Sequence, residues 1–143
     1  MAYKIKTIKN YQEGIEKMEV RLRETRAEMN KLIESYQMIF SEPLVHITKH
    51  VAAGMIQLRW RMPGTQKYSE LNEEIEIVMS LVHKESELKN EYGIFYFESK
   101  RVSLNTDYSL FFNARKKYKK SKELAQKAMQ LKYRSGAQKK DDV

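Results

Sequence analysis

The sequence predicts an α+β protein that is mainly helical, with a long N-terminal helix, a β-hairpin and a C-terminal helical region that carries a basic face. Three observations predict it: an apolar repeat at helical spacing before residue 40, an alternating repeat around residue 58, and a concentration of lysine after residue 114. A chain of 143 residues is the size of one domain, which we expect over residues 1–135, with a frayed tail at 136–143.

The first element is a helix over residues 11–40. Asn10 can cap it together with Glu13, and Pro43 follows its end, where proline disfavours helical geometry in the preceding residue. The residues of its seam alternate three and four positions apart: Ile15, Met18, Leu22, Thr25, Met29, Leu32, Tyr36 and Ile39.

This seam has two interpretations. It can be an oligomer seam, centred on Leu22, Met29, Leu32 and Tyr36, or one wall of the chain's own core. A parallel dimer would set Arg21 against Arg26 of the other copy, which opposes that pairing. An antiparallel partner or the later helices of the same chain would suit the seam better. We expect a homodimer from the seam and from the cover that the hairpin needs.

A hairpin is expected over residues 44–62. Its second strand alternates Ile56, Leu58 and Trp60 with Gln57, Arg59 and Arg61, which places two guanidinium groups on one face. The turn falls at Ala52-Ala53-Gly54. Two strands alone are marginally stable, so the Trp60 face must pack on helices or on a second copy. Because Trp60 shares that face with leucine and isoleucine, it is predicted to be a core residue and not a platform for a base.

Helices are expected over residues 69–133. Ser69 can cap the first of them, and Gly93 marks a kink or a break. Residues 94–97 have strand propensity, yet a helical interpretation is favoured from about 95 to 133. It rests on the helical spacing of Phe97, Arg101, Leu104, Tyr108, Phe111 and Tyr118.

The net charge of +8 lies entirely after residue 114. Residues 1–114 hold 16 basic and 16 acidic residues, and residues 115–143 hold 11 basic and 3 acidic ones. Such a segment binds polyanions by neutralising phosphates and releasing counterions. Nucleic acid is the favoured partner; a solvated lysine tail, an anionic membrane and an acidic protein are the alternatives.

Double-stranded DNA is the predicted ligand, with two groups of contact residues. Gln57, Arg59 and Arg61 would read bases or phosphates from the strand, because arginine suits guanine edges. The two arginines can equally pair with acidic residues between Glu70 and Glu76. The basic helix would follow the DNA backbone through Arg115, Lys116, Lys117, Lys119, Lys120, Lys122 and Lys127. In this division of labour the helix supplies affinity and the hairpin supplies preference for a site.

No catalytic residues, metal site or cofactor are predicted, and the protein is not expected to be an enzyme. His46 and His50 share a face but have no third ligand nearby, and His83 lies outside any zinc-protease motif. The chain has no cysteine, and no run of about 18 apolar residues suggests a membrane span. A soluble, cytoplasmic protein is expected, with no membrane partner.

Two short segments carry a resemblance to a known family. Residues 54–61 (Gly-Met-Ile-Gln-Leu-Arg-Trp-Arg) and residues 97–105 (Phe-Glu-Ser-Lys-Arg-Val-Ser-Leu-Asn) resemble the pattern of MobI-type accessory mobilisation proteins of conjugative elements. The resemblance covers less than a fifth of the chain. It implies a DNA-binding auxiliary factor that acts at an origin of transfer beside a separate relaxase. The alternatives are a helical adaptor that binds another protein through its seam, and an RNA-binding protein with exposed aromatic side chains.

Overall fold

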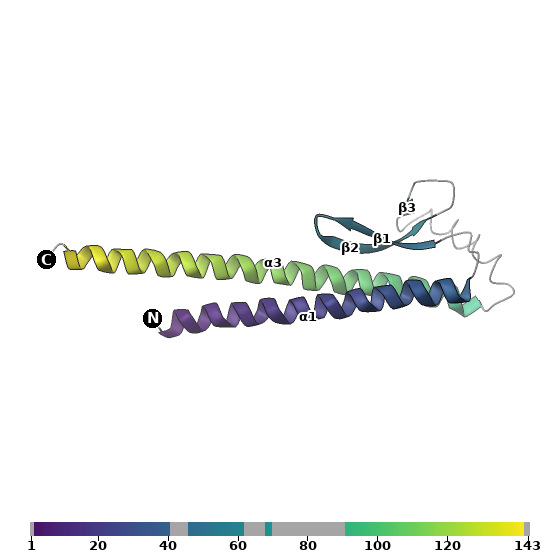
Figure 1. The fold of residues 1–143 in the computed structure, drawn as a ribbon, viewed down its shortest axis with the longest axis horizontal. Helices are drawn as coiled ribbons and strands as arrows, with labels where there is room; N and C mark the ends of the chain where they lie inside the picture. Colours follow the sequence, from purple (N-terminus) through teal and green to yellow (C-terminus); the bar gives the residue numbers. More distant parts are fainter. Residues whose placement is uncertain (1, 41–45, 62–67, 70–90, 142–143) are drawn as a thin grey trace. The chain divides into compact units, whose positions relative to one another are not determined.

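The computed structural model describes residues 2–40, 46–61, 68–69 and 91–141. The predicted fold class is confirmed: the described chain is mainly helical, with a long N-terminal helix and an antiparallel hairpin (Figure 1). It forms two compact units where the sequence predicts one domain. Unit 1 comprises Met1–Leu22 and Leu110–Val143, and unit 2 comprises Arg23–Ser109. The elements in chain order are α1 (Ala2–Ile39), β1 (His46–Ala52), β2 (Met55–Arg61), β3 (Tyr68–Ser69) and α3 (Glu91–Asp141).

Helix α1 begins nine residues before its predicted start. The proposed cap at Asn10 with Glu13 is therefore wrong, because both residues lie inside the helix and are exposed. Residues 2–10 carry alanine, lysine and isoleucine without Gly or Pro, so nothing in them stops a helix from continuing. The helix ends at Ile39, close to its predicted end, and the predicted stop at Pro43 lies outside the described residues.

The hairpin is confirmed over β1 and β2, which pair antiparallel from His46 opposite Arg61 to Ala52 opposite Met55. Its turn consists of Ala53 and Gly54, whose φ angles are +52° and +81°. Two successive positive φ values are the mark of a type I′ turn, whose twist matches that of the two strands. Glycine adopts this conformation without strain, whereas Ala53 has a Cβ that opposes it.

A short strand, β3, adds to the free side of β2 and completes a sheet in the order β1-β2-β3. Ser69, predicted to cap a helix, instead pairs with Trp60 in this strand. The helix predicted to follow it lies outside the described residues, as do the acidic residues between Glu70 and Glu76.

Helix α3 is longer than predicted at both ends and continues through Gly93 without a break. The segment 94–104, which has strand propensity, is helical. The helix continues to Asp141, through the segment after residue 135 for which fraying is expected. Phe97, Arg101, Leu104 and Tyr108 are all buried, which confirms the helical spacing that predicted this face.

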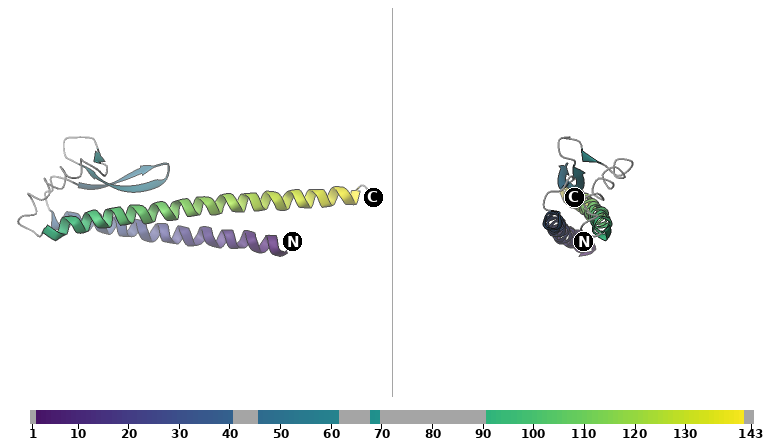
Figure 2. Two further views of the ribbon diagram at one scale, coloured as in Figure 1. Left: turned by 180° about the vertical axis from the view of Figure 1, so that it is seen from behind. Right: turned by 90° about the vertical axis from the view of Figure 1, so that its right-hand side faces the viewer.

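The core of unit 2 is aromatic. The Tyr36 ring lies edge-on to Trp60 at 5.5 Å between centroids and to Phe97 at 5.3 Å, so it joins α1, β2 and α3. Trp60 is fully buried, which confirms that it is a core residue packed on helices. In Figure 2 the hairpin forms a layer over the helices of this unit. The other buried hydrophobic residues are Met29, Leu32, Phe40, Ile47, Leu58, Leu104 and Tyr108.

In unit 1, the N-terminal half of α1 lies antiparallel to the second half of α3. The ring of Tyr118 approaches Gly14 so closely that a Cβ there would lie 3.0 Å from three ring carbons. Lys122 Nζ donates a 2.6 Å hydrogen bond to Gln12 Oε1. Glycine at position 14 leaves room for the ring, whereas a Cβ there would require the Tyr118 side chain to move by a few tenths of an ångström.

The predicted seam of α1 is buried within the single chain. Leu22, Met29, Leu32 and Tyr36 have exposed fractions of 1%, 0%, 6% and 1%. These four residues therefore do not lie on a surface where a second copy could bind, and the seam forms a wall of the core. At its end Phe40 is buried in place of Ile39, which is 44% exposed.

Candidate nucleic-acid interface

The outer face of the hairpin carries the three strand residues predicted to contact DNA. Gln57 and Arg59 are half-buried and Arg61 is exposed, whereas Leu58 and Trp60 between them point into the core. Arg59 Nη2 donates a 3.1 Å hydrogen bond to Gln57 Oε1, so these two side chains lie together on one face. The predicted alternation of β2 is confirmed.

Three residues of β1 share this outer face and were missed as candidate contacts. His46 is opposite Arg61, Thr48 opposite Arg59 and His50 opposite Gln57, and directly opposed residues of an antiparallel pair point to the same side. Thr48 Oγ1 donates to the backbone oxygen of Arg59 at 3.4 Å. The sequence could have indicated these residues, because a two-residue turn at Ala53-Gly54 determines which residues of the two strands face each other. Neither strand contains an acidic residue.

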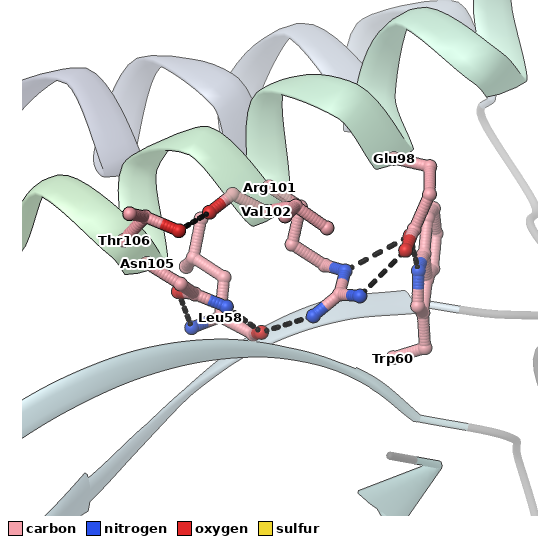
Figure 3. Close-up of polar contacts among 7 residues, drawn as sticks. All are labelled: Leu58, Trp60, Glu98, Arg101, Val102, Asn105 and Thr106. Atoms are coloured by element: carbon pink, nitrogen blue, oxygen red, sulfur yellow. Dashed lines mark hydrogen bonds and ion pairs between the residues drawn. The ribbon is translucent and has the colours of Figure 1, made fainter. Parts of the chain in front are cut away.

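Asn105 of α3 holds the central strand through its backbone (Figure 3). Its Oδ1 accepts a 2.7 Å hydrogen bond from the Leu58 N–H, and its Nδ2 donates a 2.9 Å bond to the Leu58 carbonyl. The side-chain amide thus replaces the peptide of a neighbouring strand. Arg101 Nη1 donates a second 2.9 Å bond to the same carbonyl, so both lone pairs of that oxygen are used.

Glu98 and Arg101 form an ion pair beside this contact. Arg101 Nη2 lies 2.6 Å from Glu98 Oε1 and its Nε 2.9 Å from Oε2, while Trp60 Nε1 also donates to Oε2. Burial alone would raise the pKa of Glu98, but the hydrogen bonds from Arg101 and Trp60 and the Arg101 charge lower it below its ordinary 4.5. Arg101 is only 3% exposed, so its charge is neutralised inside the protein.

We call Glu98, Arg101 and Asn105 the clamp. They lie three and four residues apart on one side of α3 and fix the hairpin to that helix (Figure 3). No signal in the sequence pairs them with Leu58 and Trp60, which are about 40 residues away. The two segments that carry the family resemblance, 54–61 and 97–105, are the two sides of this contact. The polar residues of segment 97–105 therefore position the hairpin.

The predicted backbone contacts lie along α3 in unit 1. Lys116, Lys117, Lys119, Lys120 and Lys127 are exposed, as is Lys132, which the sequence analysis did not single out. Between residues 115 and 132 there are eight basic residues and one acidic residue, Glu123. This stretch of helix is a cationic surface, and we call its exposed lysines the lysine surface.

Two predicted members of this group have other contacts. Lys122 is half-buried and bonds to Gln12 across the helix pair. Arg115 lies over the ring of Phe112, with its Cζ 5.3 Å from the ring centroid. Lys122 therefore links α3 to α1, and Arg115 packs on an aromatic ring of its own helix. Each also adds a positive charge to this part of α3. The lysine surface belongs to unit 1 and the hairpin face to unit 2, so each is a separate candidate contact region.

Sites for other chemistry are sparse in the described residues. No group of three His, Asp or Glu side chains that could hold a metal ion occurs among them. A cavity of about 250 Å³ lies between α1 and α3 of unit 2 and contains two lysines and one glutamate, but no histidine. Its lining residues are Glu28, Lys31, Leu32, Ser35, Tyr96, Lys100 and Leu104.

Comparison with family models, curated proteins and solved structures finds no match for the chain. Within the described ranges, no helix has the length and apolar character needed to cross a membrane. Function must therefore be inferred from the two cationic surfaces and from the resemblance of residues 54–61 and 97–105.

Proposed function

We propose that this protein binds double-stranded DNA without catalysing a reaction on it. The observation that carries the proposal is the lysine surface: exposed ammonium groups on a continuous helix, with Glu123 as the sole carboxylate between residues 115 and 132. Such a helix neutralises several phosphates and releases their counterions, which supplies affinity for any sequence. Lysine is a point charge on a flexible stem, and it suits contact with the DNA backbone better than reading of bases.

The outer face of the hairpin is the candidate for preference among DNA sites. A two-stranded ribbon fits the major groove, and Arg59, Arg61 and Gln57 carry the groups that bind guanine or adenine edges. The clamp supports this role, because it gives the ribbon a fixed place on α3. Side chains held on a rigid element recognise a ligand more sharply than side chains on a mobile loop.

The MobI-type resemblance supplies the biological setting of the proposal. It would make the protein a cytoplasmic accessory factor that acts at an origin of transfer, where a separate relaxase performs the chemistry. The clamp residues lie in the second resembling segment and bond to Leu58 and Trp60 in the first, so in this chain the two segments are in contact. DNA contact is argued from the cationic surfaces.

A protein adaptor is the second candidate function. Its binding surface would not be the seam of α1 that the sequence suggested. Leu22, Met29, Leu32 and Tyr36 are buried, so they offer no seam to another protein. RNA binding through stacked bases would require exposed aromatic rings; Trp60, Tyr36, Phe97 and Tyr108 are buried, whereas Tyr96 is 55% exposed. Burial of the seam and of these four rings removes the residues on which both alternatives first depended.

The test is a salt titration of the intact protein against duplex DNA, single-stranded DNA and RNA of one length. Affinity for the duplex should be highest and should fall steeply with salt concentration. The triple change of Lys116, Lys120 and Lys127 to Gln should weaken binding to every duplex. It should also reduce the slope of log K against log salt by about 2–3, or 0.9 for each lost phosphate contact.

A matched control replaces three exposed lysines of α1, Lys9, Lys17 and Lys31, by Gln. This change removes the same net charge from another part of the chain and should leave most of the affinity. Arg59→Ala should reduce preference for one site and change affinity for random DNA little. The proposal fails if the wild-type protein does not bind duplex DNA near physiological salt, or if both triple variants lose affinity equally.

A further inference from the structure

Unit 1 exposes leucine side chains along α3. Leu110, Leu124 and Leu131 are 61%, 57% and 66% exposed. The described side chains of the same unit bury just two hydrophobic residues, Ile15 and Leu22. Exposed apolar side chains gathered on one helix face mark a surface that packs against another protein surface. This face is therefore a candidate docking surface.

The three leucines lie on one side of the helix, because they are spaced by multiples of seven residues. Lys117 occupies the one position of that series without a leucine. Between these long side chains the same stripe carries small ones, Ala114, Ser121 and Ala128, again seven residues apart. We call these residues the leucine face. Long and small residues thus alternate along it.

We propose that the leucine face binds a second copy of this chain, with the two α3 helices antiparallel. A register that sets Leu124 opposite Ala114 of the second copy also sets Leu110 opposite Ala128. The same register sets Lys117 opposite Ser121. Leu110 and Leu124 then each meet an alanine, so the central part of the face fits its own copy and the helices can approach closely. A parallel dimer would instead stack Leu on Leu and place Lys117 against its own copy.

Charge adds a second property to this dimer. In the antiparallel register Lys120 lies near Lys120 of the second copy, and both copies carry the lysine surface alongside the leucine face. Like charges oppose association, so the dimer should tighten when salt or a polyanion screens them. The effect of DNA on dimerisation is the one part of this proposal that rests on the proposed function. If DNA tightens the dimer, then the dimer binds DNA more tightly than the monomer does, by the same factor.

The first experiment is sedimentation equilibrium of the intact protein at tens of micromolar. Wild type should dimerise, with a dissociation constant that falls as salt rises, opposite to the salt dependence of DNA binding. Leu110→Gln with Leu124→Gln removes the two leucine–alanine contacts of this register without changing the charge and should weaken dimerisation at least about tenfold. The control is Met38→Gln, which changes an 85% exposed apolar residue of α1 and should leave dimerisation unaltered.

The second experiment tests the orientation. The chain has no cysteine, so single cysteines report unambiguously. A mixture of Lys117→Cys and Ser121→Cys chains should form a mixed disulfide, whereas Ser121→Cys alone should crosslink slowly, because a disulfide requires Cα atoms within about 7 Å. Rapid crosslinking of Ser121→Cys to itself would overturn the antiparallel register.

The proposal as a whole is overturned if wild type is a monomer at all salt concentrations, or if the double Gln variant dimerises as well as wild type. Circular dichroism of the double variant distinguishes loss of the interface from unfolding of α3, since its helical signal should be unchanged. If the protein dimerises through this face but binds no DNA, the proposed function is wrong and the interface is supported. If it binds DNA as a monomer, the interface is wrong and the proposed function is supported.

Discussion

Unit 2 and unit 1 each contain part of α1 and part of α3, but they differ in how many hydrophobic side chains they bury. Of the twelve hydrophobic side chains buried in the described part of the chain, ten lie in unit 2, and Ile15 and Leu22 lie in unit 1. Unit 2 adds the hairpin, which places Trp60 against Tyr36 and bonds β2 to the clamp. Unit 1 has the lysine surface and exposed leucines instead.

The difference predicts that substitutions act differently in the two units. Unit 2 has an interior that can hold its elements together, since burial of large aromatic side chains is the main source of stability. Unit 1 exposes charge and apolar groups, which suit binding to partners. Substitutions in unit 2 should therefore act mainly on folding, and substitutions on the surface of unit 1 mainly on association.

Trp60→Ala should have the largest effect on stability. It removes a fully buried side chain, its contact with the Tyr36 ring and its hydrogen bond to Glu98. The expected loss is about 3–5 kcal/mol, measured by urea unfolding with circular dichroism. Tyr118→Ala in unit 1 removes a ring that is 37% exposed and should destabilise by less than about 2 kcal/mol. Equal losses would remove the distinction between the units.

Arg101→Met should destabilise by about 3 kcal/mol, because it leaves Glu98 without its buried cation and takes one donor from the Leu58 carbonyl. The unfolding is followed by fluorescence of Trp60, the single tryptophan, which reports on unit 2. Adding Glu98→Gln should recover part of the loss, since the unpaired charge is then gone. Arg26→Met changes an exposed arginine of α1 and should be nearly neutral. Failure of the double variant to recover would show that packing of the guanidinium matters more than its charge.

Asn105→Ala should cost about 1–3 kcal/mol, because the Leu58 N–H loses its acceptor while the carbonyl keeps Arg101. Amide hydrogen exchange gives the specific readout: protection of the Leu58 amide should drop more than that of its neighbours. Asn30→Ala, at an exposed position of α1, is the control for the loss of an amide side chain. Unchanged protection at Leu58 would mean that Asn105 does not complete the edge of β2.

Acid should weaken unit 2 through Glu98. Burial raises the pKa of Glu98 in the folded protein. The hydrogen bonds from Arg101 and Trp60, together with the Arg101 charge, outweigh burial and lower this pKa below 4.5. The carboxylate therefore contributes stability at neutral pH, and this contribution is lost as the pH falls from the ordinary pKa through the folded one. Urea midpoints compared at about pH 6 and pH 3.5 should fall less in Glu98→Gln than in wild type. An equal fall in both would assign the acid sensitivity to other carboxylates.

Local patterns predicted the hairpin and the buried faces well. The alternation of Leu58 and Trp60 with charged residues and the helical spacing of Phe97, Leu104 and Tyr108 each depend on one element, so the sequence carries them directly. The turn was predicted at Ala52-Ala53-Gly54, one residue longer than the turn found, and the two-residue turn at Ala53-Gly54 sets His46 and His50 opposite Arg61 and Gln57.

Helix ends and contacts between distant segments were not predictable in this way. Asn10 is a good capping residue, yet the helix continues past it because residues before it also favour helix. Gly93 and Gly136 lie inside α3, where the intrinsic penalty of glycine, about 1 kcal/mol, does not break a helix of this length. The clamp joins segments about 40 residues apart, and a polar residue within an apolar face gives no hint of its partner.

Ala53→Asn tests the smallest effect, at the tip of the hairpin. Ala53 has a φ of +52°, where an L-residue is strained unless its side chain can bond locally, and Asn-Gly is the preferred pair in a type I′ turn. The substitution should stabilise by up to about 1 kcal/mol, seen as a higher urea midpoint of Trp60 fluorescence. Ala52→Asn, in the strand beside the turn, should give no gain, because its φ is not positive. Equal gains at both positions would mean that polarity at the tip, and not backbone strain, limits the hairpin. A gain at Ala53 alone, with DNA preference unchanged, would show that the turn sets the register of the outer face without contacting DNA.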